Sequence, residues 1–411
     1  MSVRAGIQAL LFAQLCGACD HSTAPPARAG SSSTPHSETT VPVPVPALPA
    51  PPTASVTAAP SSAPAPEAPP RVAVEQVSLG DTHACVRTKD GAVWCWGSPE
   101  NGVASSVPQQ VAGIDGVTQI SAGYSETYAL KGDGSVWVWG GRNGPRPVRV
   151  ANRRASALAL GDPGSCFIGV DQQLSCSGLN DRARLGIGSP TGKKHAPQGL
   201  AKPQKVPGLP KVTQAALGNV SGCALSADHA LYCWGLGFSC AGPALQKPSD
   251  AALVALAGGK DHYCVVDANS KVRCLAPVQR GAQAMEQDTC EDYEQLERSA
   301  PWPVVGSGNA VAATAPPFCE RCAACIAAGA AGADCWNDDR GAPFGSGALS
   351  GLVHVESAHR FVQLAISTNV ACAVTDQARV VCWGKNRFEQ LGDGSPRETL
   401  RMTPLEPRFP G

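Results

Sequence analysis

Cysteine pairs at one fixed spacing are the residues of this chain best placed to do chemistry. Two cysteines lie ten residues apart in HACVRTKDGAVWCWG, from His83 to Gly97, and the same spacing recurs among the 18 cysteines of the chain. Thiols in such pairs either form structural disulfides or take part in redox exchange. The six pairs are Cys85 and Cys95, Cys166 and Cys176, Cys223 and Cys233, Cys264 and Cys274, Cys325 and Cys335, and Cys372 and Cys382.

A seventh copy of the pattern that lacks both thiols favours structural disulfides. In ETYALKGDGSVWVWG, Tyr128 and Val138 occupy the two cysteine positions. Independent core cysteines would be lost singly, whereas bonded partners are lost together. We therefore predict six disulfides, each closing a short loop and contributing roughly 2–3 kcal/mol in the chain-entropy description.

The element that positions each pair is a β-hairpin. Lys89-Asp90-Gly91 has the residues of a three-residue hairpin loop whose last member is left-handed. Cys85 and Cys95 then lie opposite each other on neighbouring antiparallel strands, close enough to bond. The midpoint is Asp or Asn in five copies, at Asp90, Asp133, Asp171, Asp228 and Asn269, whereas the last two copies lack this turn chemistry.

Each hairpin belongs to a larger repeating unit. A β-rich run such as VTQISAG or VTQAALG precedes the hairpin, and before several of these runs lies a Pro-led segment such as Pro108–Val111. Each unit therefore has four short strands, and seven units follow one another. Repeats of this size predict an all-β fold, a seven-bladed β-propeller with four-stranded antiparallel blades.

The unit resembles the regulator-of-chromosome-condensation repeat, with pattern G-x-x-H-x-x-A-L…DG-x-V-x-x-WG-x-N…QLG-x-G. The best matches are GDTHACVRTKDGAVWCWG at 80–97 and VVCWGKNRFEQLGDG at 380–394, whereas Leu275 and Asn337 break the Trp-Gly ending in units five and six. The resemblance implies a seven-bladed propeller, of the exported bacterial type that often carries cysteine pairs. The first unit lacks a Pro-led strand, so we expect residues 403–409 to pair into the first blade and close the ring.

Three regions differ in composition. Residues 1–19 have a short apolar run after Arg4 and resemble a lipoprotein signal, which implies lipidation of Cys19; ordinary secretion is the alternative. Residues 20–70 are rich in Pro, Ala and Ser and are expected to form an extended tether. Residues 71–411 are expected to form the propeller.

Composition and motifs argue against several functions. Lys and Arg number 33 and Asp and Glu also 33, so no basic excess points to nucleic acid. The sequence has no phosphate-binding glycine loop, nucleophile elbow or metal-binding helix motif. His83 and His262 share one repeat position, which favours a structural role. We therefore expect no catalytic residue, no metal site, no cofactor and no enzyme activity.

Four cysteines remain outside the pairs and the signal segment. They are Cys240, Cys290, Cys319 and Cys322, of which the last two lie in CERCAAC. In a cytosolic protein this cluster would suggest zinc or iron–sulfur, but an export signal favours additional disulfides over metal ligands or free thiols. Four cysteines allow three pairings, and the sequence does not choose among them.

Two long insertions carry charge of opposite sign, and we expect both to follow the fourth strand of a blade and so to share one face. They are candidate partner-binding loops, although charged loops that are merely solvated are the alternative. The basic candidates are Lys193, Lys194, His195, Lys202 and Lys205, and the acidic candidates are Glu286, Asp288, Glu291, Asp292, Glu294 and Glu297.

These observations predict an exported, membrane-tethered, monomeric propeller that binds a protein partner without catalysis. One alternative is an inhibitor of a secreted enzyme, since a secreted β-lactamase inhibitor has this fold. Another is a carbohydrate-binding or glycan-active propeller, which the few aromatic candidates, Phe238, Tyr293 and Trp302, do not favour.

Overall fold

The computed structural model describes part of the chain beyond the predicted tether. The described residues are 72–98, 104–161, 164–188, 199–218, 220–236, 238–259, 262–275, 304–307, 310–314, 323–327, 331–337, 353–367 and 370–410. The chain divides into two units between Ala65 and Pro66, and every described residue lies in the second. The predicted signal segment 1–19, with Cys19, and the tether 20–70 lie outside the described residues. Within the described residues, no helix is long and apolar enough to span a bilayer.

The described residues form antiparallel β-sheets, joined by loops that include two short 3-10 turns, η2 (Gly141–Asn143) and η3 (Asp181–Ala183). The first sheet contains β1 (Val74–Leu79), β2 (His83–Thr88), β3 (Val93–Gly97) and β4 (Ser105–Gln110). The second contains β5 (Val117–Ala122), β6 (Glu126–Lys131), β7 (Ser135–Gly140) and β8 (Val148–Arg154). The third contains β9 (Ala157–Gly161), β10 (Gly164–Ile168), β11 (Leu174–Leu179) and β12 (Gly199–Lys205).

The remaining sheets follow the same strand order. The fourth contains β13 (Val212–Leu217), β14 (Ser221–Ser226), β15 (Leu231–Gly235) and β16 (Ser239–Gln246). The fifth contains β17 (Leu253–Gly259), β18 (His262–Asp267), β19 (Lys271–Leu275) and β20 (Val304–Ser307). The sixth contains β21 (Ala310–Thr314), β22 (Ala323–Ala327), β23 (Ala331–Asn337), β24 (Val353–Ile366), β25 (Val370–Thr375), β26 (Val380–Lys385) and β27 (Leu400–Leu405).

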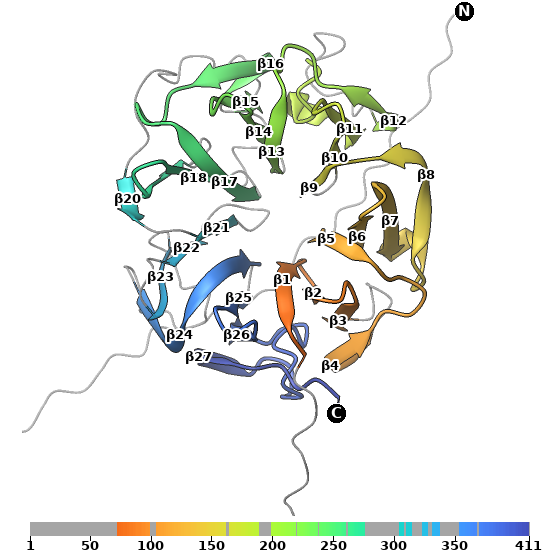
Figure 1. The fold of residues 1–411 in the computed structure, drawn as a ribbon, viewed down its shortest axis with the longest axis vertical. Coiled ribbons are helices and arrows are strands. Elements are labelled where there is room, and N and C mark those ends of the chain that lie inside the picture. Colours follow the sequence, from red (N-terminus) through yellow and green to blue (C-terminus); the bar gives the residue numbers. More distant parts are fainter. Residues whose placement is uncertain are drawn as a thin grey trace, which may run out of the picture. The chain divides into compact units, whose positions relative to one another are not determined.

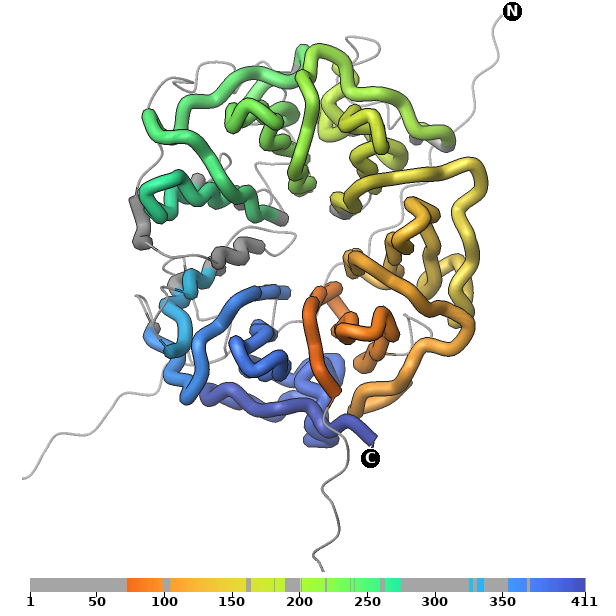
Figure 2. The backbone as a smooth tube through the Cα atoms, in the orientation of Figure 1, coloured from red at the N-terminus to blue at the C-terminus, as the bar shows by residue number. Residues whose placement is uncertain are grey.

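The sheets are arranged as the blades of a propeller, with the first strand of each four-stranded sheet towards the middle and the fourth at the rim (Figure 1). Figure 2 shows the start of the described chain, in orange, beside its last part, in blue. The backbone amide of Val74 donates to the carbonyl of Ala378 over 2.8 Å, which agrees with this placement. The all-β propeller with four-stranded antiparallel blades is therefore as predicted.

The number of separate blades differs from the prediction, because the described residues form six sheets rather than seven. The reason is β24, whose 14 residues run without a break. Its first part pairs with β23 as far as Arg360, and its second part pairs with β25 from Phe361 onwards. One strand thus takes the fourth place of one unit and the first place of the next.

The predicted pairing of residues 403–409 with the first blade is wrong. Strand β27 pairs with β26 of its own sheet, and Leu405 lies opposite Cys382. The fourth strand of the first sheet is β4, which contains Pro108. A Pro-led strand therefore completes the hairpin before it, so the first unit lacks no strand.

The corrected strand order also changes where the two long insertions occur within their sheets. The segments 189–198 and 276–303 join the third strand of a sheet to its fourth strand, β11 to β12 and β19 to β20. They do not follow a fourth strand, as the sequence pattern suggested. Both still occupy the same connection in their respective sheets.

All six cysteine pairs are disulfide-bonded in the structure, and each pair lies in direct register across its hairpin. The Cα atoms of Cys85 and Cys95 are 4.1 Å apart, as are those of the other pairs. This short separation is typical of a non-hydrogen-bonded antiparallel pair. The register that the spacing predicted extends to the divergent fifth and sixth copies, at Cys264 with Cys274 and Cys325 with Cys335.

The hairpin loops keep one geometry even where glycine is absent. The third loop residue has positive φ in the first copy, at Gly91 (80°), and equally in the last, at Ala378 (54°). The amide of each donates to the residue three positions earlier, Thr88 and Thr375 respectively. Strand pairing therefore determines the turn as well as the loop residues do, because a non-glycine residue adopts positive φ only at a cost in conformational free energy.

Most of the disulfides pack against the next sheet rather than into solvent. The Cys85–Cys95 bond shares an apolar cluster with Trp139 of the second sheet, and Trp139 is fully buried. The Cys166–Cys176 bond packs in the same way with Trp234 of the fourth sheet. The Cys325–Cys335 bond instead packs with Trp383 of its own seven-stranded sheet. The layer between the second and third sheets has no disulfide and consists of aliphatic and aromatic side chains.

The second sheet fills the disulfide position with other side chains. Tyr128 and Val138 lie directly opposite each other, at the register that the cysteines occupy elsewhere. The ring of Tyr128 packs edge-on against Phe167 of the third sheet, with ring centres 5.8 Å apart. Aromatic packing against the neighbouring sheet replaces the covalent bond here.

Because the geometry is shared, the double variant Tyr128→Cys/Val138→Cys should form a seventh disulfide. Peptide mass mapping without reductant should find the two residues linked. We expect the oxidised variant to exceed Tyr128→Ala/Val138→Ala in free energy of unfolding by about 2 kcal/mol, from loop closure. Reaction of both new thiols with a thiol reagent in the folded protein would contradict the shared geometry.

Candidate functional site

Most of the charged residues predicted to bind a partner lie outside the described residues. This holds for Lys193, Lys194 and His195, and for Glu286, Asp288, Glu291, Asp292, Glu294 and Glu297. It also holds for Cys290, Cys319 and Cys322, and for the side chain of Cys240, whose backbone belongs to β16. Their roles and pairings therefore stay predictions.

Two predicted residues, Lys202 and Lys205, are described and lie on β12, the outermost strand of the third sheet. The Lys205 ammonium lies 3.4 Å from a carboxylate oxygen of Asp171 in the hairpin loop of the same sheet, and both side chains are exposed. An exposed pair of this kind adds little to stability. The two lysines thus belong to a rim strand rather than to a free loop.

Glutamine side chains join neighbouring sheets near the middle of the molecule, which sequence reasoning missed. The amide oxygen of Gln76 on β1 accepts from the backbone N–H of Ile120 on β5, and its amide nitrogen donates to the carbonyl of the same residue, both over 2.9 Å. Gln119 on β5 makes the same pair of bonds with Leu158 on β9, over 2.9 and 3.4 Å. Each amide thus supplies one acceptor and one donor, as a further strand would.

The same interaction joins the last part of the chain to the first. Gln363 on β24 accepts from the N–H of Val77 over 2.8 Å and donates to its carbonyl over 3.2 Å. Gln214 joins the fourth sheet to the fifth through the N–H of Leu256 and the carbonyl of Val254. These bonds satisfy backbone groups on the free edge of an inner strand, where an unpaired group would be costly.

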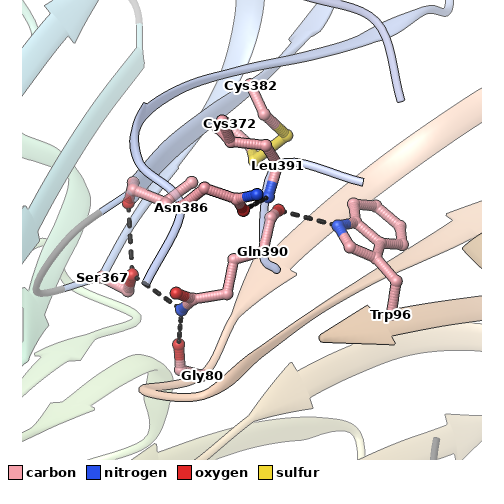
Figure 3. The surroundings of a disulfide bond; sticks show 9 residues. Gly80, Trp96, Ser367, Cys372, Cys382, Asn386, Gln390 and Leu391 are labelled. Carbon is pink, nitrogen blue, oxygen red and sulfur yellow. Dashed lines mark hydrogen bonds between the residues drawn. A yellow bond between two sulfur atoms is a disulfide. The ribbon is translucent and has the colours of Figure 1, made fainter. Parts of the chain in front are cut away.

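A second kind of joint lies further out and again links the last part of the chain to the first sheet. The indole N–H of Trp96 on β3 donates over 2.7 Å to the carbonyl of Gln390, in the loop between β26 and β27 (Figure 3). The amide of Gln390 donates in turn to the carbonyls of Gly80 and Asp81. Asn386 holds this loop in shape, because its side-chain oxygen accepts from the N–H of Leu391 over 3.0 Å.

The third and fourth sheets repeat this joint. Trp234 donates over 2.7 Å to the carbonyl of Arg184, and Asn180 accepts from Leu185 over 3.0 Å, as Asn386 does from Leu391. The glycine after the leucine must have no side chain, since a Cβ on Gly392 would lie 2.7 Å from the Trp96 indole nitrogen. The N-x-x-x-x-L-G segment therefore builds an acceptor for the next tryptophan, which gives this part of the repeat a structural purpose.

His83 lies inside the contact between the first two sheets and is fully buried. Its Nε2 is 2.7 Å from the hydroxyl of Thr127 on β6, while Nδ1 has no hydrogen-bond partner among the described residues. Burial lowers the pKa of His83 to about 4, so the ring is neutral at pH 7. In the fourth sheet, Ser221 takes the same strand position and hydrogen-bonds Tyr263 of the fifth sheet over 2.9 Å. A buried, neutral side chain at an inter-sheet contact supports a structural role.

The turn aspartates are likewise engaged within their own loops. A hydrogen bond from Thr88 is the largest cause of the lowered pKa of Asp90, and one from Ser135 has the same effect on the pKa of Asp133. Both carboxylates are therefore ionised acceptors that hold a turn.

In the part of the chain that the structure describes, no group of three or more His, Cys, Asp or Glu side chains is placed to hold a metal ion. Phe238, an aromatic candidate for glycan binding, is buried against Tyr263.

Comparison with known families assigns the first hairpin. Residues 74–103, which span β1 to β3 and the loop after them, match the sequence model described as Regulator of chromosome condensation (RCC1) repeat. This chain carries an RCC1 repeat. The matched residues include Gln76, His83, the Cys85–Cys95 pair and Trp96. No curated protein sequence matches the chain significantly.

Solved structures with a similar chain path include RCC1 proteins. Prp20p of Saccharomyces cerevisiae is 17% identical, with 82% of this chain and 77% of that chain covered and a TM-score of 0.46. Human WBSCR16 is 15% identical, with 85% and 89% covered and a TM-score of 0.45. The ectodomain of the Physcomitrella patens receptor kinase CR4 is 16% identical, with 75% and 72% covered and a TM-score of 0.46. We draw no functional conclusion from similarity at this level.

The buried His83 predicts a specific pH dependence of stability. Its pKa is about 4 in the folded protein and 6.5 in the unfolded chain, so between these values only the unfolded chain binds the proton. Stability is therefore complete above pH 6.5 and falls as the pH drops towards 4, by about 3 kcal/mol from this group. Urea unfolding of His83→Gln between about pH 7 and 4.5 should show a flatter dependence than the parent.

The matched control is Ser221→Ala, which alters the same strand position in the fourth sheet without removing a titratable group. This variant should keep the pH dependence of the parent, whatever its overall stability. Equal pH dependence in the parent and in His83→Gln would contradict a neutral, buried histidine.

Proposed function

We propose that this protein is a non-enzymatic propeller that binds a protein partner outside the cytoplasm. The observation that carries the proposal is the set of hairpin disulfides, which occur in every described sheet except the second. Disulfides of this kind form and persist in oxidising compartments such as the cell envelope and the medium. In this proposal residues 1–19 direct export and Cys19 carries the lipid anchor. The tether at 20–70 then displays the propeller.

We further infer that residues 71–411 form a closed ring of seven four-stranded units. Two observations support this arrangement. Strand β24 serves two units at once, so the seven-stranded sheet accommodates two sets of four. The last sheet also meets the first through the same glutamine and tryptophan joints that connect neighbouring sheets elsewhere. A ring leaves no inner strand edge without a neighbour.

Binding rather than catalysis is favoured by how the described polar side chains are used. His83 is a buried, neutral side chain between two sheets, and hydrogen bonds within their own hairpin loops lower the pKa values of Asp90 and Asp133. The insertions at 189–198 and 276–303 connect equivalent strands, so they leave their sheets at the same end. Loops gathered at one end of a repeat protein are a common place for a partner to bind.

The proposal is tested by affinity capture with the full, oxidised chain. Immobilised protein is exposed to envelope and culture fractions of the producing cells, with the 20–70 segment alone as control. We expect one protein to be retained, and replacement of 189–198 or 285–298 by Gly-Ser sequence of equal length to reduce its capture about tenfold.

Two results would count against a protein-binding role. One is the retention of no protein by the full chain. The other is capture that is equal for the full chain and the 20–70 control.

A further inference from the structure

One rim segment concentrates positive charge without any carboxylate. Residues 142–154 read RNGPRPVRVANRR, with five arginines and no Asp or Glu, although the whole chain has 33 basic and 33 acidic residues. The segment runs from η2 into β8, the outermost strand of the second sheet. We call residues 142–154 the arginine strip.

The arginines at the start of the strip are exposed and form no ion pair with any residue that the structure describes. Among the described residues, no carboxylate lies within ion-pair distance of Arg142, Arg146 or Arg149. After the hydrogen bonds from Ser135, the charge of Arg149 makes a smaller contribution to the lowered pKa of Asp133. Arginines on other rim strands differ, since Arg401 on β27 lies 3.5 Å from the carboxylate of Asp393.

The other end of the strip is held in place by the protein itself. The guanidinium of Arg153 lies 4.5 Å above the ring of Phe167 on the third sheet. Arg154 donates to the carbonyl of Asp133 over 2.6 Å. These contacts fix the end of β8, and Arg149 extends from this ordered strand, whereas Arg142 belongs to η2 and Arg146 to the connection between η2 and β8.

The strip is poorly suited to pairing with another strand through its backbone. Pro145 and Pro147 have no N–H to donate, and Asn152 has a left-handed φ of 53° that interrupts the strand. A partner must therefore be recognised by side chains. Guanidinium groups bind carboxylates in a bidentate manner and retain their charge at all physiological pH values.

Apolar surface beside the charges favours a polypeptide over a simple polyanion. Val148 is 52% exposed, and Trp137, which lies opposite Arg149 on β7, is partly exposed. Tryptophan, arginine and aliphatic contacts together are typical of protein interfaces. The arginines are three and four residues apart, so neighbouring charges are at most about 14 Å from each other along the backbone.

We propose that the arginine strip binds an extended acidic segment of a partner protein, with carboxylates at every third or fourth residue. This inference rests on the proposed protein-binding function and names the chemistry of one contact. Arg142, Arg146 and Arg149 bind the carboxylates, and Trp137, which shares the face of Arg149, contacts a side chain between them.

The test uses the full chain and a fluorescein-labelled peptide of three Glu-Ser-Val-Thr repeats, with binding measured by fluorescence anisotropy. A peptide with Gln in place of Glu is the uncharged probe. The variant Arg142→Gln/Arg146→Gln/Arg149→Gln is compared with Lys89→Gln/Lys211→Gln/Lys247→Gln, which loses three exposed positive charges elsewhere. We expect salt-sensitive binding of the Glu peptide, weakened about tenfold in the arginine variant and less than about twofold in the lysine variant.

Three results would overturn the inference. The parent fails to bind the Glu peptide, the two variants weaken binding equally, or inorganic polyphosphate binds the strip more tightly than the peptide does. The affinity capture described above separates this inference from the proposed function. If the arginine variant captures a partner as well as the parent does, the strip is not part of the interface, although the protein-binding function stands. If neither captures a partner, the proposed function itself is contradicted.

Discussion

The fold depends on how the free edges of its inner strands are satisfied. Inner strands have backbone groups that face away from their own sheet. At four of the described inner strands a glutamine of the neighbouring sheet accepts from one N–H and donates to one carbonyl, as Gln363 does for Val77. One side chain thus supplies the hydrogen bonds that a neighbouring strand would otherwise make, and the inner strands lie close together. Because Val77 is 2% exposed, water is not available to serve instead. Similar bonds at other sheets make the arrangement repeatable.

The disulfides and the tryptophans stabilise the same contacts between sheets, at positions further from the middle of the propeller than the glutamines. A disulfide makes each hairpin rigid on the side that faces the next sheet, and a buried indole packs against it. The N–H of that indole then needs an acceptor, which the Asn-stabilised loop provides for Trp96 and Trp234. The second sheet shows that the bond itself is replaceable, since Tyr128 fills the same space by packing. What the repeat conserves physically is the filled and hydrogen-bonded contact between sheets.

The hairpins were predictable because both bonded residues and the loop lie within fifteen residues of sequence. The Pro-led strand was assigned to the wrong neighbour, because a strand between two hairpins matches either one by sequence pattern alone. The continuous β24 was missed because VHVESAHRFVQLAI, although it contains the start of a new unit, has no Gly or Pro at the junction. A sequence pattern could have revealed the glutamine joints, because Gln occupies the third place of VEQVS, VTQIS, VTQAA and FVQLA. Such a residue resembles an ordinary solvent-facing position until the neighbouring sheet is in place.

The most direct test of this account is site-resolved amide hydrogen exchange at Val77 in the native protein. The account predicts strong protection, comparable to that of the Ile120 amide, because each is bonded to a glutamine of the adjoining sheet. Protection at Val77 should be lost in Gln363→Ala while Ile120 is unchanged. Rapid exchange at Val77 in the native protein, with Ile120 protected, would contradict the account, because the first and last parts of the chain would then not be joined.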